Sequence, residues 1–254
     1  MNGAGGARAS LLRGITRNVV VLGLVSLLTD VSSELLVHVI PLFLANVLAA
    51  TPTVIGIVEG IAEGVAAFVK LGSGALSDRF ARRKILVGAG YATSTVAKAL
   101  YLVATAWPIV LVARVADRIG KGIRTAPRDA LIADSTPSEA RGRAFGLHRA
   151  MDTLGAVIGV GLAAVIIELA QGGAALLEVE TFRLLALAAL VPGLLALLVI
   201  GLGVRDVPRA ARASAAPAAR VLASGQRARF PRAFWVFVAA TGLFTLGNSS
   251  DAFL

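Results

Sequence analysis

Acidic side chains recur inside long apolar stretches of this sequence, where charge is otherwise rare. Asp30 and Glu34 lie four residues apart in the first stretch, and Glu59 and Glu63 repeat that spacing in the second. Residues four apart share one face of a helix. A charge in hydrocarbon costs at least about 2.5 kcal/mol, so a carboxylate there needs a partner, water or a function. Together with Asp152, these acids predict proton-carrying groups or structural ion pairs.

Basic side chains occur at similar depth in the segment 107–133. Arg114, Arg118 and Lys121 lie there, and Arg118 is roughly 16 Å along a helix from Trp107. Two interpretations stay open. Arg118 tunes a proton-carrying carboxylate or grips an anionic group, or the charges form a structural salt bridge or a water-facing cavity wall. The candidate residues for proton coupling or a substrate cavity are Asp30, Glu34, Glu63, Arg118 and Asp152.

The composition is typical of a membrane protein. Of the 254 residues, 57% are hydrophobic and only 16% are charged, and the mean hydropathy is +0.81. The chain has no cysteine, which excludes disulfides, a thiolate nucleophile and cysteine-ligated zinc. The two histidines, His38 and His148, lie far apart in the sequence. We therefore expect no metal site, and no motif indicates a cofactor.

Seven apolar segments are long enough to form membrane-spanning helices, which need about 20 residues to cross about 30 Å of hydrocarbon. Most of the 25 lysines and arginines fall on one side of these segments if the N-terminus is cytoplasmic. Because positive charge is retained in the cytoplasm, we expect a multi-pass protein of the cell (inner) membrane with its N-terminus inside. This orientation also accounts for the net charge of +10 without a nucleic-acid partner. The segments are 17–48, 53–73, 84–105, 107–133, 144–170, 182–204 and 233–254.

The chain is predicted to divide into four parts. A Ser-Ser-acid triplet follows the apolar run of both the first and the last segment, at 32–34 and 249–251. We therefore expect an N-terminal half that stops at the first helix of a second half. The parts are a cytoplasmic N-terminus (1–16), a six-helix transmembrane domain (17–204), a cytoplasmic linker rich in Ala, Arg, Pro and Ser (205–232), and the first helix of a truncated C-terminal domain (233–254).

The stretch "GALSDRFARRKIL", residues 74–86, lies in the expected cytoplasmic hairpin between the second and third segments. It resembles the signature loop of the major facilitator superfamily, G-x-L-x-D-R-x-G-R-R/K. Ala81 replaces the usual glycine of that loop. Two further stretches resemble the family: "RIGKG" at 118–122, with Lys in a position that is often Gln, and "RGRAFGL" at 141–147. The matching residues of an inner-loop gating motif are Gly74, Asp78, Arg79, Arg82 and Arg83.

The resemblance implies an all-α integral membrane fold. In this family the six-helix bundle consists of inverted 3+3 repeats, a substrate cavity lies between two six-helix halves, and transport occurs by alternating access. A seventh transmembrane helix would follow the cytoplasmic linker. The partners that this implies are a small-molecule substrate, protons, the lipid membrane, and either a missing C-terminal half or a homodimer partner.

An enzyme is one function to consider, but no catalytic motif supports it. The sequence contains no P-loop, H-E-x-x-H or G-x-S-x-G pattern. The first choice is a secondary transporter that exports a small or drug-like solute with proton coupling. The alternatives are a proton–solute symporter for uptake and a non-transporting helix-bundle subunit. The stretch "GAVIGVG" at 155–161 lacks the proline that the family's exporters often carry.

Two glycine patterns predict close helix packing. Gly155, Gly159 and Gly161 lie in the fifth segment, and the second segment carries glycine at 56, 60 and 64. Small residues at this spacing let the backbones of two helices approach. We expect packing to be their main role.

Overall fold

The structure, a computed structural model, describes residues 14–79, 82–173, 176–207 and 232–248. Every regular element within these ranges is helical. The chain divides into two compact units, residues 1–209 and 210–254. The described part of the second unit is the helix α11, Arg232–Asn248, which overlaps the segment 233–254 where a seventh helix was expected.

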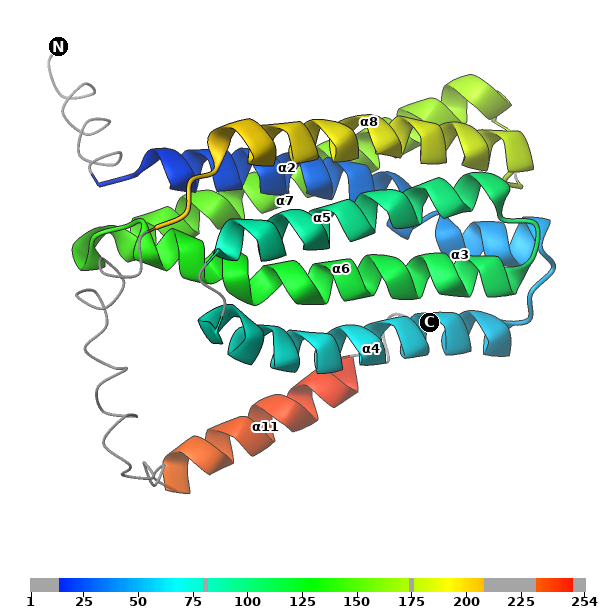
Figure 1. Cartoon of the computed structure of the whole chain (residues 1–254). Helices are drawn as coiled ribbons and strands as arrows, with labels where there is room; N and C mark the ends of the chain where they lie inside the picture. Colours follow the sequence, from blue (N-terminus) through cyan, green and yellow to red (C-terminus); the bar gives the residue numbers. More distant parts are fainter. Residues whose placement is uncertain (1–13, 80–81, 174–175, 208–231, 249–254) are drawn as a thin grey trace, which may run out of the picture. The chain divides into compact units, whose positions relative to one another are not determined.

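The described part of the first unit has six long helices, which run side by side (Figure 1). Short helical turns connect some of them: α3 (Ile40–Leu42), η1 (Phe43–Val47), η2 (Tyr101–Val103) and η3 (Ser138–Ala140). The long helices are α2 (Arg17–Val37), α4 (Pro52–Arg79), α5 (Arg83–Leu100), α6 (Trp107–Asp134), α7 (Arg141–Gln171) and α8 (Val179–Gly203).

The first and second helices differ from the sequence expectation in instructive ways. The first apolar segment is interrupted after Val37, and the chain restarts as α3 with Pro41 in its first turn. Proline has no N–H to continue the helix, and its ring clashes with the carbonyl four residues earlier, which belongs to Val37. Helix α4 instead runs past the expected end at 73, through Gly72 and Gly74, to Arg79. The turn before α5 is therefore shorter than predicted.

Four helices of the described chain are long and apolar enough to cross a membrane: Arg17–Val47, Arg83–Val103, Ser138–Gln171 and Val179–Gly203. Helices α4 and α6, of 28 residues each, are not among them. Both carry charged side chains along their length. A bundle of membrane helices is thus confirmed, whereas six spans arranged as inverted repeats stay a prediction.

The long helices of the first unit pack in a definite order. Helix α2 contacts both α7 and α8, α5 contacts both α8 and α6, and α6 contacts α4. Two apolar clusters fill the space between them. Phe43 stacks on Phe182 in one, with ring centroids 3.7 Å apart, and Leu22, Tyr91 and Leu131 lie in the other.

Glycines set how closely these helices approach. A methyl group on Gly155 of α7 would meet the carbonyl oxygen of Leu27 on α2 and lie 3.0 Å from its Cα. A methyl on Gly159 would lie 2.8 Å from the carbonyl oxygen of Val31. The packing prediction is confirmed for these two glycines, whereas Gly161 faces open space.

The glycines of α4 behave differently. A methyl on Gly60 or Gly64 would meet no atom within 4 Å, and the same holds for Gly72 and Gly74. The prediction that this ridge packs a neighbouring helix is therefore wrong for Gly60 and Gly64 within the described part of the first unit. The same glycine spacing therefore has two outcomes in the described residues. Gly155 and Gly159 of α7 face α2, whereas Gly60 and Gly64 of α4 face no other helix.

Adding one methyl at Gly155 should destabilise the bundle. Gly155→Ala places that methyl against the backbone of α2, where overpacking costs typically about 1–3 kcal/mol. Gly161→Ala is the matched control, because it adds the same group to the same helix in open space. Thermal unfolding in detergent should show a lower midpoint for Gly155→Ala only. Equal midpoints for the two variants would contradict the packing described here.

Candidate functional site

Helix α6 presents a row of basic side chains to α4 and α2. Arg114, Arg118 and Lys121 recur at intervals of four and three residues, which places them on one helical face. Helix α4 presents Glu59 and Glu63 at the same level. The period of the helix thus aligns two carboxylates with the first two guanidinium groups.

Both carboxylates of α4 form ion pairs with α6. Arg114 donates from Nε to Oε1 of Glu59 at 2.9 Å, and a second guanidinium nitrogen of Arg114 donates to the other oxygen of Glu59. Arg118 lies 2.7 Å from Oε1 of Glu63. The side chain of Arg114 is only 4% exposed, whereas that of Glu63 is 60% exposed. The pairing of acids and bases across the bundle, expected from the sequence, is present between these two helices.

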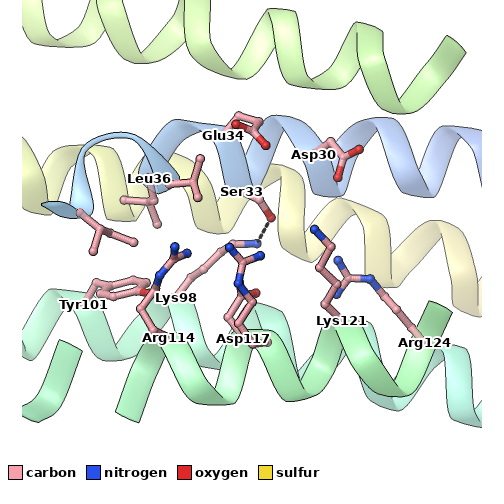
Figure 2. A pocket seen from close by; sticks show the side chains of 13 residues that line it. Asp30, Ser33, Glu34, Leu36, Lys98, Tyr101, Arg114, Asp117, Lys121 and Arg124 are labelled. Carbon is pink, nitrogen blue, oxygen red and sulfur yellow. Dashed lines mark hydrogen bonds between the residues drawn. The ribbon is translucent and has the colours of Figure 1, made fainter. Parts of the chain in front are cut away.

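A first cavity of about 110 Å³ lies between α2, α5 and α6 (Figure 2). Its walls carry more basic than acidic side chains. Lys98 is 2% exposed, and its Nζ donates to the Ser33 hydroxyl at 3.2 Å. The bases are Lys98, Arg114, Arg118, Lys121 and Arg124, and the acids are Asp30, Glu34 and Asp117.

A second cavity, of about 480 Å³, is lined by residues of α2, α4, α6 and α7. It shares Asp30, Lys121 and Arg124 with the first cavity. Figure 2 shows Asp30 on α2 and Lys121 on α6 directed toward each other across the first cavity. These three charged residues therefore stand where the two cavities meet.

Arg124 is a buried cation with polar but uncharged partners. Its side chain is 5% exposed, and it donates to the Ser94 hydroxyl at 2.6 Å. The guanidinium also lies 4.4 Å from the centre of the Tyr91 ring, as a cation–π contact. Methyl groups on Gly90 or Gly120 would meet the backbone of the facing helix, so α5 and α6 are in close contact beside this arginine.

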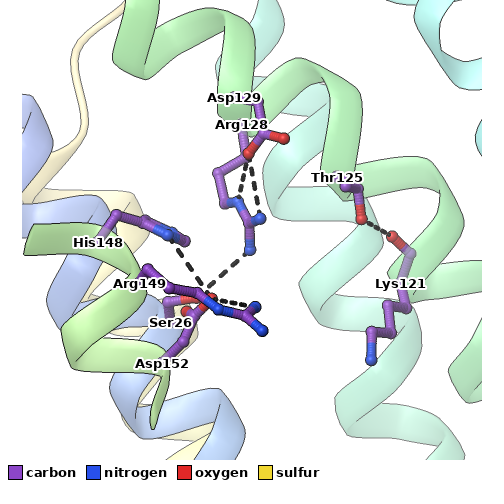
Figure 3. Close-up of polar contacts among 8 residues, drawn as sticks. All are labelled: Ser26, Lys121, Thr125, Arg128, Asp129, His148, Arg149 and Asp152. Carbon is purple, nitrogen blue, oxygen red and sulfur yellow. Dashed lines mark hydrogen bonds and ion pairs between the residues drawn. The ribbon is translucent and has the colours of Figure 1, made fainter. Parts of the chain in front are cut away.

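Asp152 of α7 lies in a cluster of charges at the second cavity (Figure 3). Its Oδ2 lies 3.7 Å from Nδ1 of His148 and 3.8 Å from Arg149. Its other carboxylate oxygen is buried and has no hydrogen-bond partner in the described chain. Arg128 of α6 reaches the hydroxyl of Ser26 at 3.4 Å. The carboxylate of Asp152 is thus only partly satisfied.

The remaining candidates from the sequence, Glu34 and Asp30, differ in their ion-pair partners. Glu34 pairs with His38 one turn along α2, at 3.1 Å, and not with a base of α6. Asp30 forms no ion pair with any described residue, although it faces the bases of both cavities. All five candidates line the cavities: Glu34 and Arg118 the first, Glu63 and Asp152 the second, and Asp30 both. Glu63 and Arg118 are in addition partners in one ion pair.

The inner-loop motif is described only in part. Gly74 lies inside α4, and Asp78 and Arg79 lie in its last turn, but the side chains of those two lie outside the described residues. Arg82 is exposed. Arg83 is buried and forms an ion pair with Asp134 at the end of α6. The motif is therefore tied to α6 through its last arginine.

Hydrogen bonds join several chain segments at this end of the first unit. The side-chain amide of Asn18 donates to Ser135 at 2.9 Å and to the carbonyl oxygen of Arg205 at 2.8 Å. The backbone N–H of Lys84 donates to Asp206 at 2.9 Å. The starts of α2 and α5 and the ends of α6 and α8 are held together there.

Lys98 and Asp117 were not singled out from the sequence. Both are buried in the bundle and line the first cavity. A signal for Lys98 existed, since it is the only charged residue between 85 and 105 of that apolar segment. Asp117 directly precedes Arg118, and only the fold shows that its side chain also faces the cavity.

Comparison with known sequences identifies related proteins. The model of the Major Facilitator Superfamily matches residues 22–254. An uncharacterized MFS-type transporter of Methanocaldococcus jannaschii is 32% identical over 241 residues, which are 95% of this chain and 56% of that protein. An uncharacterized protein of Mycobacterium tuberculosis is 37% identical over 143 residues, 56% of this chain and 35% of the relative. The chain spans about half the length, or less, of these relatives.

Solved structures share the fold. A bacterial homologue of the human drug peptide transporters PepT1 and PepT2 superposes with a TM-score of 0.65 at 18% identity, over 91% of this chain and 53% of that one. A bacterial homologue of the human lysosomal transporter Spinster, in an inward-facing and occupied conformation, has a TM-score of 0.61 at 21% identity, over 75% of this chain and 44% of that one. The matched region is about half of each solved chain.

Neutralising Glu59 should destabilise the protein, because it leaves the buried guanidinium of Arg114 without its carboxylate. Breaking a buried pair by removing one partner costs about 3–5 kcal/mol. Glu180→Gln is the control, since Glu180 pairs with Arg183 at the surface at 3.0 Å, where such pairs contribute about 0–1 kcal/mol. Unfolding in detergent should show a large loss for Glu59→Gln and a small one for Glu180→Gln. Similar losses would mean that the buried pair is not needed for stability.

Proposed function

Because the chain belongs to the major facilitator superfamily, we propose that it acts in proton-coupled secondary transport of a small solute by alternating access. Membership of this family supports a role in membrane transport. The observation that carries the finer proposal is the charged cavity wall formed by Asp30, Lys121 and Arg124. Ionisable groups facing water inside a membrane bundle are the ordinary means of binding protons and polar solutes.

Asp30 is the proposed proton carrier. It is the only acid of the described cavity walls that lies on both cavities, and it faces bases without forming an ion pair among the described residues. Asp152 is the second candidate, because one of its buried oxygens has no partner in the same part of the chain. Glu34 and Glu63 already have partners in His38 and Arg118, which favours structural or gating roles for them.

The direction of transport has two candidates. Export of a small or drug-like solute is the first choice from the sequence, and proton–solute symport is the alternative. The surplus of bases around Asp30 supports the alternative. When Asp30 is protonated, these bases lose its negative charge, and a negatively charged solute could then neutralise them. A non-transporting helix bundle, the third candidate, gives no reason for cavities lined by charge.

A second helical bundle should complete the substrate cavity. The chain spans about half of the M. jannaschii relative and of the solved transporters. In this family, substrate sites lie at the interface of two repeated halves. We propose that the second half is either the remainder of a longer chain or a second copy, and that α2, α4, α6 and α7 face it.

The remaining proposals concern topology. All six long helices of the first unit would cross the membrane as an inverted 3+3 repeat, with a cytoplasmic N-terminus (1–16), a cytoplasmic linker (205–232) and a seventh span within 233–254. The positive-inside distribution of Lys and Arg supports this orientation in the cell (inner) membrane. The motif of Gly74, Asp78, Arg79, Arg82 and Arg83 would act as an inner gate, supported by the ion pair of Arg83 with Asp134.

Asp30→Asn should abolish the proton-coupled part of transport. The amide cannot release a proton, so solute addition should no longer move protons into or out of proteoliposomes that contain the complete transporter. A pH-sensitive dye inside the vesicles reports this movement while a panel of solutes is screened. Glu168→Gln is the control, because Glu168 is an exposed acid near the end of α7. Proton movement in Asp30→Asn equal to that of the wild type would refute the coupling role.

Cysteine labelling should test the orientation directly, because the natural chain has no cysteine. Ser138→Cys lies in the turn before α7 and Thr105→Cys in the turn before α6, and both positions are exposed. In intact cells a membrane-impermeant maleimide should label only Thr105→Cys, and Ser138→Cys should react after the membrane is opened. The reverse pattern would place the N-terminus outside.

A further inference from the structure

The pairing of acids on α4 with bases on α6 stops after two turns. Glu59 pairs with Arg114 and Glu63 pairs with Arg118. Four residues further along α4 the same face carries Ala67. The helices still touch at this level, because a methyl on Gly122 of α6 would lie 3.2 Å from the carbonyl oxygen of Ala66. A third carboxylate is therefore missing where the backbone of α4 remains close.

The next two bases of α6 lie at this level without a carboxylate partner. Neither Lys121 nor Arg124 forms an ion pair with any acid of the described ranges, and both line the two cavities. The larger cavity opens here, beside the small side chains of Ala66 and Ala67. The structure thus combines an open space with two bases that no acid of α4 neutralises.

We propose that this space binds an oxyanion group of the transported solute, a carboxylate or a phosphate, between Lys121 and Arg124. The inference rests on the proposed transport function and adds to it the chemical class of the solute. The bound anion would take the place of the third carboxylate that α4 lacks.

The two bases suit this task in different ways. A guanidinium binds carboxylate or phosphate through parallel N–H groups, and Arg124 is already held in place by Ser94 and Tyr91. An ammonium on a flexible stem adapts to solutes of different shape, and the side chain of Lys121 is exposed to the cavity. One base is thus fixed and the other is mobile.

Asp30 links anion binding to protons. It faces the same two bases from α2, so its negative charge competes with a bound anion for them. Protonation of Asp30 removes that competition, and the proton and the anion should therefore bind together, as symport requires. Helix α8 presents no charged residue along 184–203. Besides Asp30, the charged and titratable groups that face this region are Glu34 of α2, Glu63 and Lys70 of α4, Tyr91 and Lys98 of α5, Tyr101 of η2, Arg114, Asp117, Arg118, Lys121, Arg124, Arg128 and Asp129 of α6, and His148, Arg149 and Asp152 of α7.

The first test measures anion binding to the purified protein. Inorganic phosphate or succinate should raise the unfolding temperature above that in chloride of equal ionic strength. Whichever of the two stabilises more identifies a phosphate or a carboxylate as the preferred group. Lys121→Gln should weaken this binding at least about tenfold, as expected for loss of a charged hydrogen-bond donor, and Lys121→Arg should retain most of it. No stabilisation by either anion, or equal binding by Lys121→Gln, would overturn the proposal.

The second test supplies the missing carboxylate. Ala67→Glu extends the row of Glu59 and Glu63 by one turn, so its side chain should pair with Lys121 and displace the anion. Ala67→Gln has the same shape without the charge. The anion should no longer raise the unfolding temperature of Ala67→Glu, and it should raise that of Ala67→Gln clearly more. Equal anion binding by the two variants would show that the bases are not the site.

Measuring anion binding at several pH values, together with solute-driven proton movement, distinguishes failure of the oxyanion site from failure of the proposed proton coupling. Anion stabilisation should be stronger at mildly acidic than at alkaline pH in the wild type, and Asp30→Asn should reduce this difference. Anion binding without any solute-driven proton movement would sink the proposed coupling and leave the oxyanion site. Proton-coupled movement of a cation such as tetraphenylphosphonium, without anion stabilisation, would leave the transporter and sink the oxyanion site.

Discussion

The need to neutralise charge inside an apolar bundle determines the arrangement of this structure. Helix α6 carries basic side chains along the face that it presents to α4 and α2, and a lone charge at membrane depth is costly. Helix α4 supplies the opposite charges, because its Glu59 and Glu63 pair with Arg114 and Arg118. These pairs explain how two helices too polar to count as membrane spans by composition can lie within the same bundle as four that do.

The face of α6 that contacts α5 is closely packed. Gly90 and Gly120 allow the backbones of α5 and α6 to touch, and Arg124 is fastened to α5 through Ser94 and Tyr91. Gly155 and Gly159 do the same for α7 against α2. This close packing gives the cavity a firm wall, so that Arg124 holds its position without forming an ion pair among the described residues. Preorganised groups of this kind bind a ligand at a lower entropic cost.

Sequence reasoning predicted the helices well because hydropathy and helical period are local properties. The limits 107–133 expected for one helix lie within one residue of α6. Contacts between helices were harder to predict. The helical period shows which residues share a face of one helix, but not which face the neighbouring helix turns toward it. Glu34 lines the first cavity together with the bases of α6, but its ion-pair partner is His38 and not one of those bases. The spacing of Gly60 and Gly64 equals that of Gly155 and Gly159, yet among the described residues only the second pair meets another helix.

The same logic accounts for the position of the cavities. An acid on every turn of α4 would neutralise α6 completely and stabilise a closed contact between the two helices. Alanine at 66 and 67 removes both the charge and the bulk at the third turn, so the protein there holds bases whose stabilisation its own α4 does not supply. Ser94 and Tyr91 stabilise Arg124 in part, and the proposed solute anion would supply the rest. Bases left without a carboxylate lower the stability of the empty protein, and a bound anion restores that stability. This is the usual relation between stability and function at binding sites.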